Sequence, residues 1–427
     1  MPEPQITTLP GGERVATEPL RGVRSVALGV WIATGSRDEP PSRAGVSHFI
    51  EHLLFKGSSR YSAQDIAELF DAMGGEINAA TSRETTVVYT RIPDRRLEEA
   101  LDAMLDMVFA PAFEDVDSER EVVLEEIAMV DDNPQELVHD LAAEAVFGNH
   151  PLGRPVIGRA EVIAGVSPRA LRSYHGGAYV GPNIVLSAAG HVSHDRLVEL
   201  FAASRARSNG ASNLRRPLLG RASRPGYRFL RRKTEQYHVV LGGTGIGRDD
   251  SRRYAVSVLD AILGGSASSR LFQEIREKRG MAYSVYTYGS QYTETGQVGV
   301  YVGTREDNLA ECLEIVVSEI SDIAAGNVRT DELARAKENL KGRILLSLES
   351  TSARMTRLGK STITDTPLLT PEQVVKRLEA VEADEVAELA DALLAPDRLS
   401  VAGIGPDPAR FAEAVERVNP KLAEKAA

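Results

Sequence analysis

Two histidines four residues apart, with a glutamate directly before the second, are the first side chains in this sequence whose spacing could do chemistry. They lie in the segment His48-Phe49-Ile50-Glu51-His52. In a helix His48 and His52 face the same side about one turn apart, so both imidazoles can bind one metal ion. Glu51 flanks that face and can act as a base toward a water held there. This inverted form of the H-E-x-x-H motif predicts a zinc site, and the alternative is three side chains that decorate a helix surface.

A catalytic zinc needs a third protein ligand, and a carboxylate is a usual one. The helix expected over residues 115–130 carries Glu119, Glu125 and Glu126. Glu119 and Glu126 are seven residues apart and share one helix face, whereas Glu125 points elsewhere. The residues alone do not choose between them, because paired glutamates on a helix are usually solvated. A structural zinc closed by Cys or His ligands is a poor alternative, since the only cysteine is Cys312, expected in the core.

Short strands and amphipathic helices must position these side chains. In the first half we expect helices at residues 43–55, 62–73, 95–109, 115–130 and 134–147, and strands at 24–34, 76–81 and 85–92. The second half repeats this order, with a helix at 249–263 and strands at 236–243, 283–288, 297–302 and 398–403. The repetition predicts an α+β fold of two tandem homologous domains, each a mainly antiparallel sheet covered by helices. We place the zinc-binding domain at residues 1–205, an exposed, solvated linker at 206–225, and a second domain without zinc at 226–427.

Three segments in this order resemble a known family. They are residues 45–57, residues 78–84, and residues 119–127 followed by Pro134. The chain resembles the pitrilysin-like inverzincin metallopeptidases, and within them the half-length subunits related to mitochondrial processing peptidase. The likeness covers nearly the whole chain. A glycine-rich loop like that of the non-catalytic processing-peptidase subunit is missing, so the chain resembles the catalytic type.

The resemblance implies roles for both glutamates on the helix over residues 115–130. Glu126 matches the third zinc ligand, although it follows His52 at slightly less than the usual family spacing. Glu119 matches a second glutamate that supports the site without binding the metal. The shortened spacing falls between residues 91 and 117 and leaves the ligand assignment in place.

The strand expected at residues 76–81 lies between the two zinc-binding helices in the sequence. If it is an edge strand, it can receive an extended peptide by strand addition, which is largely indifferent to peptide sequence. An ordinary internal strand is the alternative. Asn78, Ala79 and Ala80 match the family segment against which substrate peptides lie, so the resemblance implies that they bind substrate.

A charged segment of the second half supplies further candidates. Its pattern predicts a helix that ends at Gly280 and is followed by a strand. The resemblance implies that Arg276 and Tyr283 reach the substrate from this half. A guanidinium can bind peptide carbonyls and a phenol can stabilise a developing oxyanion. Arg270 is a weaker candidate whose alternative role is a structural ion pair.

Composition excludes several classes of partner. The 427 residues include 50 Lys and Arg against 61 Asp and Glu, a formal charge of −11, which opposes binding to nucleic acid. Residues 1–20 lack the basic start and apolar run of a signal peptide, and no apolar stretch approaches the roughly 20 residues that span a bilayer. The nucleotide-binding loop G-x-x-x-x-G-K-[ST] is also missing. We expect a cytoplasmic protein without membrane, nucleic-acid or nucleotide partners.

The resemblance implies a zinc-dependent endopeptidase with one Zn²⁺ per chain. It would hydrolyse oligopeptides or unfolded polypeptide segments inside the chamber of a homodimer, with zinc-activated water as nucleophile and Glu51 as general base. The runner-up is a non-catalytic assembly subunit, since some family members have lost the zinc site, but the zinc-binding residues are intact here. An enzyme that requires a separate partner chain lies between these two, and the presence of Arg276 and Tyr283 disfavours it.

Overall fold

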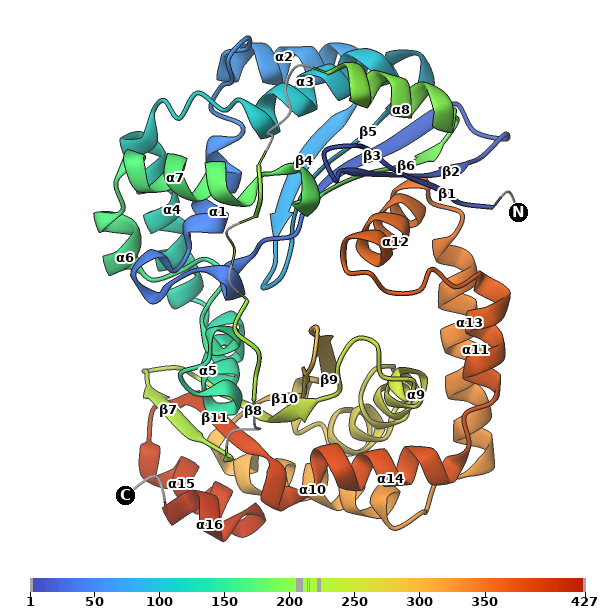
Figure 1. Cartoon of the computed structure of the whole chain (residues 1–427). Helices are drawn as coiled ribbons and strands as arrows, with labels where there is room; N and C mark the ends of the chain where they lie inside the picture. The colour runs from blue at the N-terminus through green and yellow to red at the C-terminus, as the bar shows by residue number, and fades with distance from the viewer. Residues whose placement is uncertain (1–2, 205–209, 213, 215, 221–223, 425–427) are drawn as a thin grey trace. The chain divides into compact units, whose positions relative to one another are not determined.

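The computed structural model describes residues 3–204, 210–212, 214, 216–220 and 224–424. Within it the chain packs into two compact units. The first comprises Met1–Ala128, Pro155–Pro217 and Leu346–Leu368, and the second comprises Met129–Arg154, Leu218–Leu345 and Leu369–Ala427. Each unit is built on its own β-sheet, so the two are described separately (Figure 1).

The first unit has a six-stranded sheet with spatial order β1-β2-β6-β3-β5-β4. Its strands are β1 (Gln5–Thr8), β2 (Arg14–Pro19), β3 (Ser25–Ile32), β4 (Glu76–Thr81), β5 (Thr86–Pro93) and β6 (Ile184–Gly190). Neighbouring strands are antiparallel except β2 and β6. β3 and β6 are buried almost throughout, because helices cover both faces of the sheet at its centre. β4 lies at one edge.

Helices α2 (Ala63–Met73), α3 (Leu97–Phe109) and α8 (His194–Ala203) lie on one face of this sheet, and α12 (Thr351–Ile363) lies on the other (Figure 1). Alternate residues of β3 serve the two faces, as the two-residue period of a strand requires. Val26, Leu28, Val30 and Ile32 belong to the main core cluster, whereas Ala27 and Trp31 pack with Met355 and Ile363 of α12. A helix from late in the chain therefore completes the first unit.

Gly359 allows α12 to approach the sheet closely. A Cβ at this position would lie 1.9 Å from Trp31 Nε1. We expect Gly359→Ala to lower the free energy of unfolding by about 1–3 kcal/mol, because the added methyl group must displace the indole. Trp31 is the only tryptophan, so its fluorescence maximum reports the displacement directly.

Gly342 of α11 (Thr330–Ser347) is the matched control for this substitution. No heavy atom lies within 4 Å of a Cβ built there. Gly342→Ala should leave the fluorescence unchanged and raise stability by about 0.5–1 kcal/mol, the usual gain for alanine over glycine in a helix. Equal stability changes in the two variants would contradict the close approach at Gly359.

The second unit has a five-stranded sheet with order β7-β11-β8-β10-β9. Its strands are β7 (Tyr227–Arg231), β8 (Tyr237–Gly245), β9 (Ala282–Gln291), β10 (Gly296–Thr304) and β11 (Ser400–Gly405). Neighbours are antiparallel except β7 and β11. In chain order this is the connectivity of β2 to β6 in the first sheet, so the same strand arrangement occurs twice.

Helices α9 (Arg253–Leu263), α10 (Leu309–Ala324), α14 (Ala383–Leu394) and α15 (Pro408–Val418) lie on one face of the second sheet, and α5 (Pro134–Phe147) lies on the other (Figure 1). The remaining α-helices are α1 (Val46–Leu53), α4 (Val116–Asp131), α6 (Ala160–Gly165), α7 (Pro168–Ala178), α13 (Pro371–Glu379) and α16 (Pro420–Ala423). The prediction of an α+β fold with two helix-covered sheets is confirmed.

Each unit includes one helix from the other half of the chain, α12 in the first and α5 in the second. The boundaries of the packing units therefore differ from the boundaries of the tandem sequence repeats. The domain boundaries at residues 205 and 225 stay a prediction about the repeats. Within the predicted linker, residues 206–209, 213, 215 and 221–223 lie outside the described part of the chain.

Arg216 in the predicted linker is half-buried rather than solvated. Its guanidinium lies 2.8 Å from the carboxylate of Asp38, whose side chain is 1% exposed. The carbonyl oxygen of Pro217 accepts a hydrogen bond from Arg37 at 2.6 Å. A buried carboxylate requires a cation, and Arg216 supplies one, which fixes this part of the segment on the first unit.

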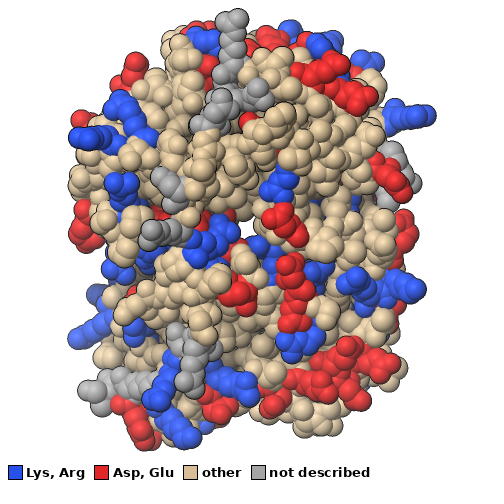
Figure 2. Space-filling view, viewed as in Figure 1, with Lys and Arg blue, Asp and Glu red and all other residues tan. Residues whose placement is uncertain are grey.

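Acidic and basic side chains are interspersed on the face of the molecule shown in Figure 2. This distribution agrees with the modest negative charge of the sequence. None of the described helices is long and apolar enough to cross a membrane.

Candidate metal centre

Helix α1 is fixed at its amino-terminal end by a glycine and a buried carboxylate. Gly45 caps the helix with a φ of 96°, and a Cβ there would lie 2.7 Å from Gly158 Cα, so only glycine fits. The Glu39 carboxylate accepts hydrogen bonds from the backbone N–H groups of Gly45 (2.7 Å) and Ser47 (2.6 Å). These bonds satisfy donors that the first turn of a helix leaves free. The start of α1 is thereby held in place.

The two faces of α1 have different surroundings. Phe49, Ile50 and Leu53 are fully buried and anchor the helix in the core. The opposite face presents His48 and His52, whose side chains are 13% and 21% exposed. Their ring centroids lie 4.7 Å apart, as expected for side chains one helical turn apart. Both imidazoles are therefore accessible from the same side.

Helix α4 brings a carboxylate to this pair. Glu126 Oε2 lies 3.3 Å from His52 Nε2 and 3.6 Å from His48 Nε2. Bonds of about 2.0–2.2 Å at tetrahedral angles separate zinc ligand atoms by about 3.3–3.6 Å. The three side chains form the only group of this kind among the described residues, with ligand atoms all within 4.8 Å of one another. Their donor set and spacing fit one zinc ion.

Glu119 lies on the far side of His52 from this group. Its Oε1 accepts a hydrogen bond from His52 Nδ1 at 2.8 Å, and its Oε2 lies 2.8 Å from Lys56 Nζ. Because Nδ1 then carries the proton, the lone pair of His52 Nε2 points toward Glu126 and is free to bind a metal. The Glu119 side chain is 5% exposed, so Lys56 compensates the charge of a buried carboxylate.

The protonation of His48 also suits a metal ligand. Burial, followed by repulsion from His52, lowers the pKa of the His48 imidazole to about 4. The ring is neutral at physiological pH and offers a lone pair. Each imidazole can turn a lone pair toward Glu126, and a cation placed between the three side chains would be attracted to all of them. The electrostatics of the group therefore fit a bound cation.

Glu51 lies beside the two histidines on α1, and a residue of β4 holds its carboxylate. Its Oε2 accepts a hydrogen bond from Thr81 Oγ1 at 2.5 Å. Burial raises the pKa of the Glu51 carboxyl, whereas the hydrogen bond from Thr81 acts in the opposite direction. A carboxyl group with a raised pKa is better matched to proton transfer near neutral pH than a solvated one.

Strand β4 has a free edge on the side away from β5. At the turn between them, Ser82 N–H donates a hydrogen bond to the Thr85 carbonyl at 2.8 Å. Hydrogen-bonded and non-hydrogen-bonded pairs alternate along an antiparallel ladder, so the N–H and C=O groups of Ala79 and Thr81 point away from β5. The Ala79 N–H donates instead to Asn78 Oδ1 at 2.8 Å.

The position of β4 decides between the two alternatives for this strand, an edge strand or an internal strand. β4 is not an internal strand of the sheet. Asn78 and Ala80 are exposed and Ala79 is half-buried, so the predicted substrate-binding segment is accessible. α1, which carries the histidines and Glu51, contacts β4.

Arg276 and Tyr283 lie side by side in the second unit. The guanidinium carbon of Arg276 lies 4.4 Å from the centroid of the Tyr283 ring and 4.7 Å from that of Phe272. The predicted α-helix is a π-helix over Phe272–Glu277, a form often found at functional sites, and Gly280 with φ of 61° follows it. Tyr283 is 77% exposed, so its hydroxyl is open to solvent.

Arg270 has the structural role that was the alternative to substrate binding. It is 7% exposed and donates hydrogen bonds to Glu332 (2.6 Å), Asp322 (2.7 Å) and the Asn327 carbonyl (2.6 Å). These partners occupy its guanidinium and join the segment that precedes the π-helix to α11 and the end of α10.

Three residues of the centre were not predicted as site residues. Lys56 and Thr81 lie inside segments that carried the family resemblance, and this position was a signal that they belong to the site. Their partners, Glu119 and Glu51, are far away in the chain, so the contacts themselves could not be predicted. Glu39 caps α1 from a loop and has no recognisable spacing to the histidines.

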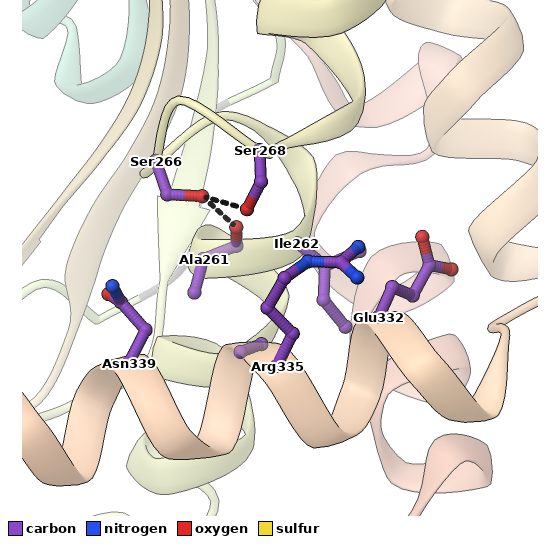
Figure 3. A pocket seen from close by; sticks show the side chains of 8 residues that line it. Ala261, Ile262, Ser266, Ser268, Glu332, Arg335 and Asn339 are labelled. Atoms are coloured by element: carbon purple, nitrogen blue, oxygen red, sulfur yellow. Dashed lines mark hydrogen bonds between the residues drawn. The ribbon is translucent and has the colours of Figure 1, made fainter.

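A small cavity in the second unit does not compete with this centre. It has a volume of about 10 Å³ and lies between α9, the loop that follows it and α11 (Figure 3). Ser266 Oγ donates to the Ala261 carbonyl at 3.3 Å and lies 3.4 Å from Ser268 Oγ. The space holds about one water molecule and no peptide.

Two family profiles match the chain. The one described as "Insulinase (Peptidase family M16)" matches residues 14–160, and the one described as "Peptidase M16 inactive domain" matches residues 165–340. An uncharacterized zinc protease from Streptomyces coelicolor is 42% identical over 94% of this chain and 89% of its own length. The uncharacterized zinc protease YmxG from Bacillus subtilis is 40% identical over 91% of this chain and 95% of its own length.

Solved structures share the fold. A protease from Helicobacter pylori superposes with a TM-score of 0.88 at 19% identity, covering 95% of this chain and 100% of that one. A peptidase M16 inactive domain from Pseudomonas fluorescens superposes with a TM-score of 0.86 at 23% identity, covering 95% and 98%. The same arrangement of two sheets and their helices therefore occurs in both.

Proposed function

The chain belongs to peptidase family M16 and is a zinc metallopeptidase, and from this premise we propose that it is an endopeptidase for oligopeptides or unfolded polypeptide segments. One Zn²⁺ per chain is held by His48, His52 and Glu126, and Glu51 is the general base. The observation that carries the proposal is the convergence of three ligand atoms at zinc-like separations.

The test uses the purified chain without added partners. We expect about one zinc per chain by elemental analysis and cleavage of an internally quenched peptide within its sequence. A chelator should abolish cleavage, and added Zn²⁺ should restore it. A chain that retains zinc but leaves peptides and unfolded proteins intact would favour the non-catalytic assembly subunit instead.

The residues of the centre have different roles in hydrolysis. When bound, zinc polarises the scissile carbonyl and acidifies the attacking water. Glu51 accepts the proton of that water and passes it to the leaving amine, so its carboxylate acts first as base and then as acid. Glu119 holds the orientation of His52 through Nδ1.

Strand addition to β4 explains how peptides of different sequence can bind. The outward N–H and C=O groups of Ala79 can pair with a peptide main chain. Asn78 Oδ1 occupies the Ala79 N–H in the absence of a peptide, and a peptide carbonyl can replace it. Main-chain pairing places an extended segment beside α1 without reading its side chains.

We propose that Arg276 and Tyr283 of the second unit also act on the substrate. Stacking on the Tyr283 and Phe272 rings orients the Arg276 guanidinium, whose Nε lies 3.6 Å from Glu277 Oε1 and whose terminal N–H groups can bind peptide carbonyls. The exposed Tyr283 hydroxyl is suited to stabilise the oxyanion of the tetrahedral intermediate.

We expect Arg276→Ala and Tyr283→Phe each to lower kcat by about a hundredfold or more while zinc content and folding stay unchanged, because each removes a donor that acts on the transition state. Steady-state kinetics with the quenched peptide measure the loss. Arg279→Ala is the matched control, since Arg279 pairs with Glu274 on the same segment. If both variants cleave at the wild-type rate, the second unit contributes no chemistry.

A homodimeric chamber in the cytoplasm is the proposed setting, and it rests on the family resemblance. A chamber admits extended chains and excludes folded proteins by size. Sedimentation of the purified chain tests the dimer. Comparison of cleavage rates for one protein in its folded and unfolded forms tests the chamber, and equal rates would contradict it.

A further inference from the structure

Thr81 connects the general base to the strand proposed to receive the peptide. It is the last residue of β4, and its hydroxyl donates a hydrogen bond of 2.5 Å to Glu51 Oε2. The backbone of Thr81 also acts on the same carboxylate, and it opposes the rise in the Glu51 pKa that burial causes. The side chain and the backbone of one residue thus both face Glu51.

The register of the β4–β5 hairpin explains why the backbone of Thr81 faces Glu51. Thr81 pairs with Thr86 in a position where the backbone N–H points to the free edge of the sheet. The Glu51 carboxylate therefore lies at the free edge of β4, two residues beyond Ala79. A peptide that pairs with Ala79 runs along this same edge toward Glu51.

A carboxylate beside a metal site has two competing positions. It can turn toward the metal as a further ligand, or it can face the attacking water as a base. Repulsion from Glu126 disfavours the first position but does not select an orientation for the second. The hydrogen bond from the Thr81 hydroxyl does select one, because it holds Oε2 in place while Oε1 can accept a proton.

We propose that Thr81 is a positioning residue for the general base, which holds Glu51 at the end of the substrate-binding edge and away from the metal ligands. The proposal rests on the proposed function, in which Glu51 is the base and β4 receives the peptide. It adds a residue that touches neither the metal nor the reacting atoms and acts only through Glu51.

The test compares Thr81→Val with Thr81→Ser. Valine keeps the branched shape of threonine and removes the hydroxyl, whereas serine keeps the hydroxyl. Thr85→Val is the matched control, because Thr85 lies in the same hairpin and its hydroxyl contacts Ser82 rather than Glu51. For each variant we would measure zinc content, thermal unfolding, kcat and KM, with Glu51→Gln as the reference for loss of the base.

We expect Thr81→Val to lower kcat about ten- to a hundredfold, the effect of losing a hydrogen bond to a charged group, with KM and zinc content unchanged. Thr81→Ser and Thr85→Val should stay within about threefold of wild type. In a Glu51→Gln background, Thr81→Val should add no further loss of kcat, because residues that act as a unit are not additive. A labelled peptide should bind Glu51→Gln and the double variant with equal affinity by fluorescence anisotropy.

Several outcomes would overturn the proposal without touching the proposed function. One is wild-type kcat in Thr81→Val while Glu51→Gln is inactive. Others are loss of zinc or folding in Thr81→Val that Thr81→Ser shares, or a further loss of kcat on top of Glu51→Gln. Wild-type turnover in Glu51→Gln itself would overturn the assignment of the base, and the proposal with it.

Discussion

Glu51→Gln should retain zinc and lose nearly all hydrolysis. Glutamine keeps the size of the side chain and a carbonyl oxygen for the Thr81 hydroxyl, but it cannot accept a proton. General-base catalysis contributes about 10²–10⁴-fold, so kcat should fall by that factor. Elemental analysis for zinc and turnover of a quenched peptide on the same sample separate the loss of the base from the loss of the metal.

The matched control is Glu125→Gln on α4. Glu125 is exposed, and its position on the helix takes it away from the centre. It should keep full activity and zinc. Wild-type turnover in Glu51→Gln would exclude Glu51 as the base, since none of its neighbours in α1 is a carboxylate. Loss of zinc in the variant would instead place Glu51 among the metal ligands.

Local patterns predicted the elements whose ends are fixed by neighbouring residues. The helix predicted at residues 134–147 is found at Pro134–Phe147, because Asn133 caps it, proline begins it and Gly148 follows it. The strand predicted at 76–81 is found at Glu76–Thr81 for a similar reason, since Gly74 ends the preceding helix in a left-handed conformation. Long-range packing was not predictable in this way. Nothing within α5 or α12 indicates that each packs on the sheet of the other half.

In the metal centre, too, local spacing was predictable from the sequence and long-range packing was not. Helical spacing is enough to put His48 and His52 on one face, because both lie in one short helix. The choice between Glu119 and Glu126 depends on how far α4 extends past α1. These residues are about 10 Å apart along the helix axis, so a displacement of α4 would exchange their roles. Only the family resemblance made that choice from the sequence. In the structure Glu119 contacts His52 Nδ1, whereas Glu126 lies near His52 Nε2, and the assignment of the ligand stays a prediction.

Glu126→Gln should lower the affinity for zinc more than any replacement on α4. The amide removes the negative charge that faces both imidazoles and leaves a weak ligand in its place. We expect the dissociation constant for zinc to rise more than a hundredfold, with activity lost in proportion to occupancy. Competition with a chromophoric chelator measures the affinity, and excess Zn²⁺ should recover part of the activity.

Glu119→Gln distinguishes a ligand from a residue that supports one. Its carboxylate binds His52 Nδ1 and Lys56 rather than the space between the imidazoles, so zinc affinity should fall only about 10–100-fold. The ratio of the two effects assigns the third ligand. If Glu126→Gln keeps full zinc and Glu119→Gln loses it, the ligand on α4 is Glu119. The short distances from Glu126 Oε2 to the two imidazoles would then reflect neighbouring side chains that share no metal ion.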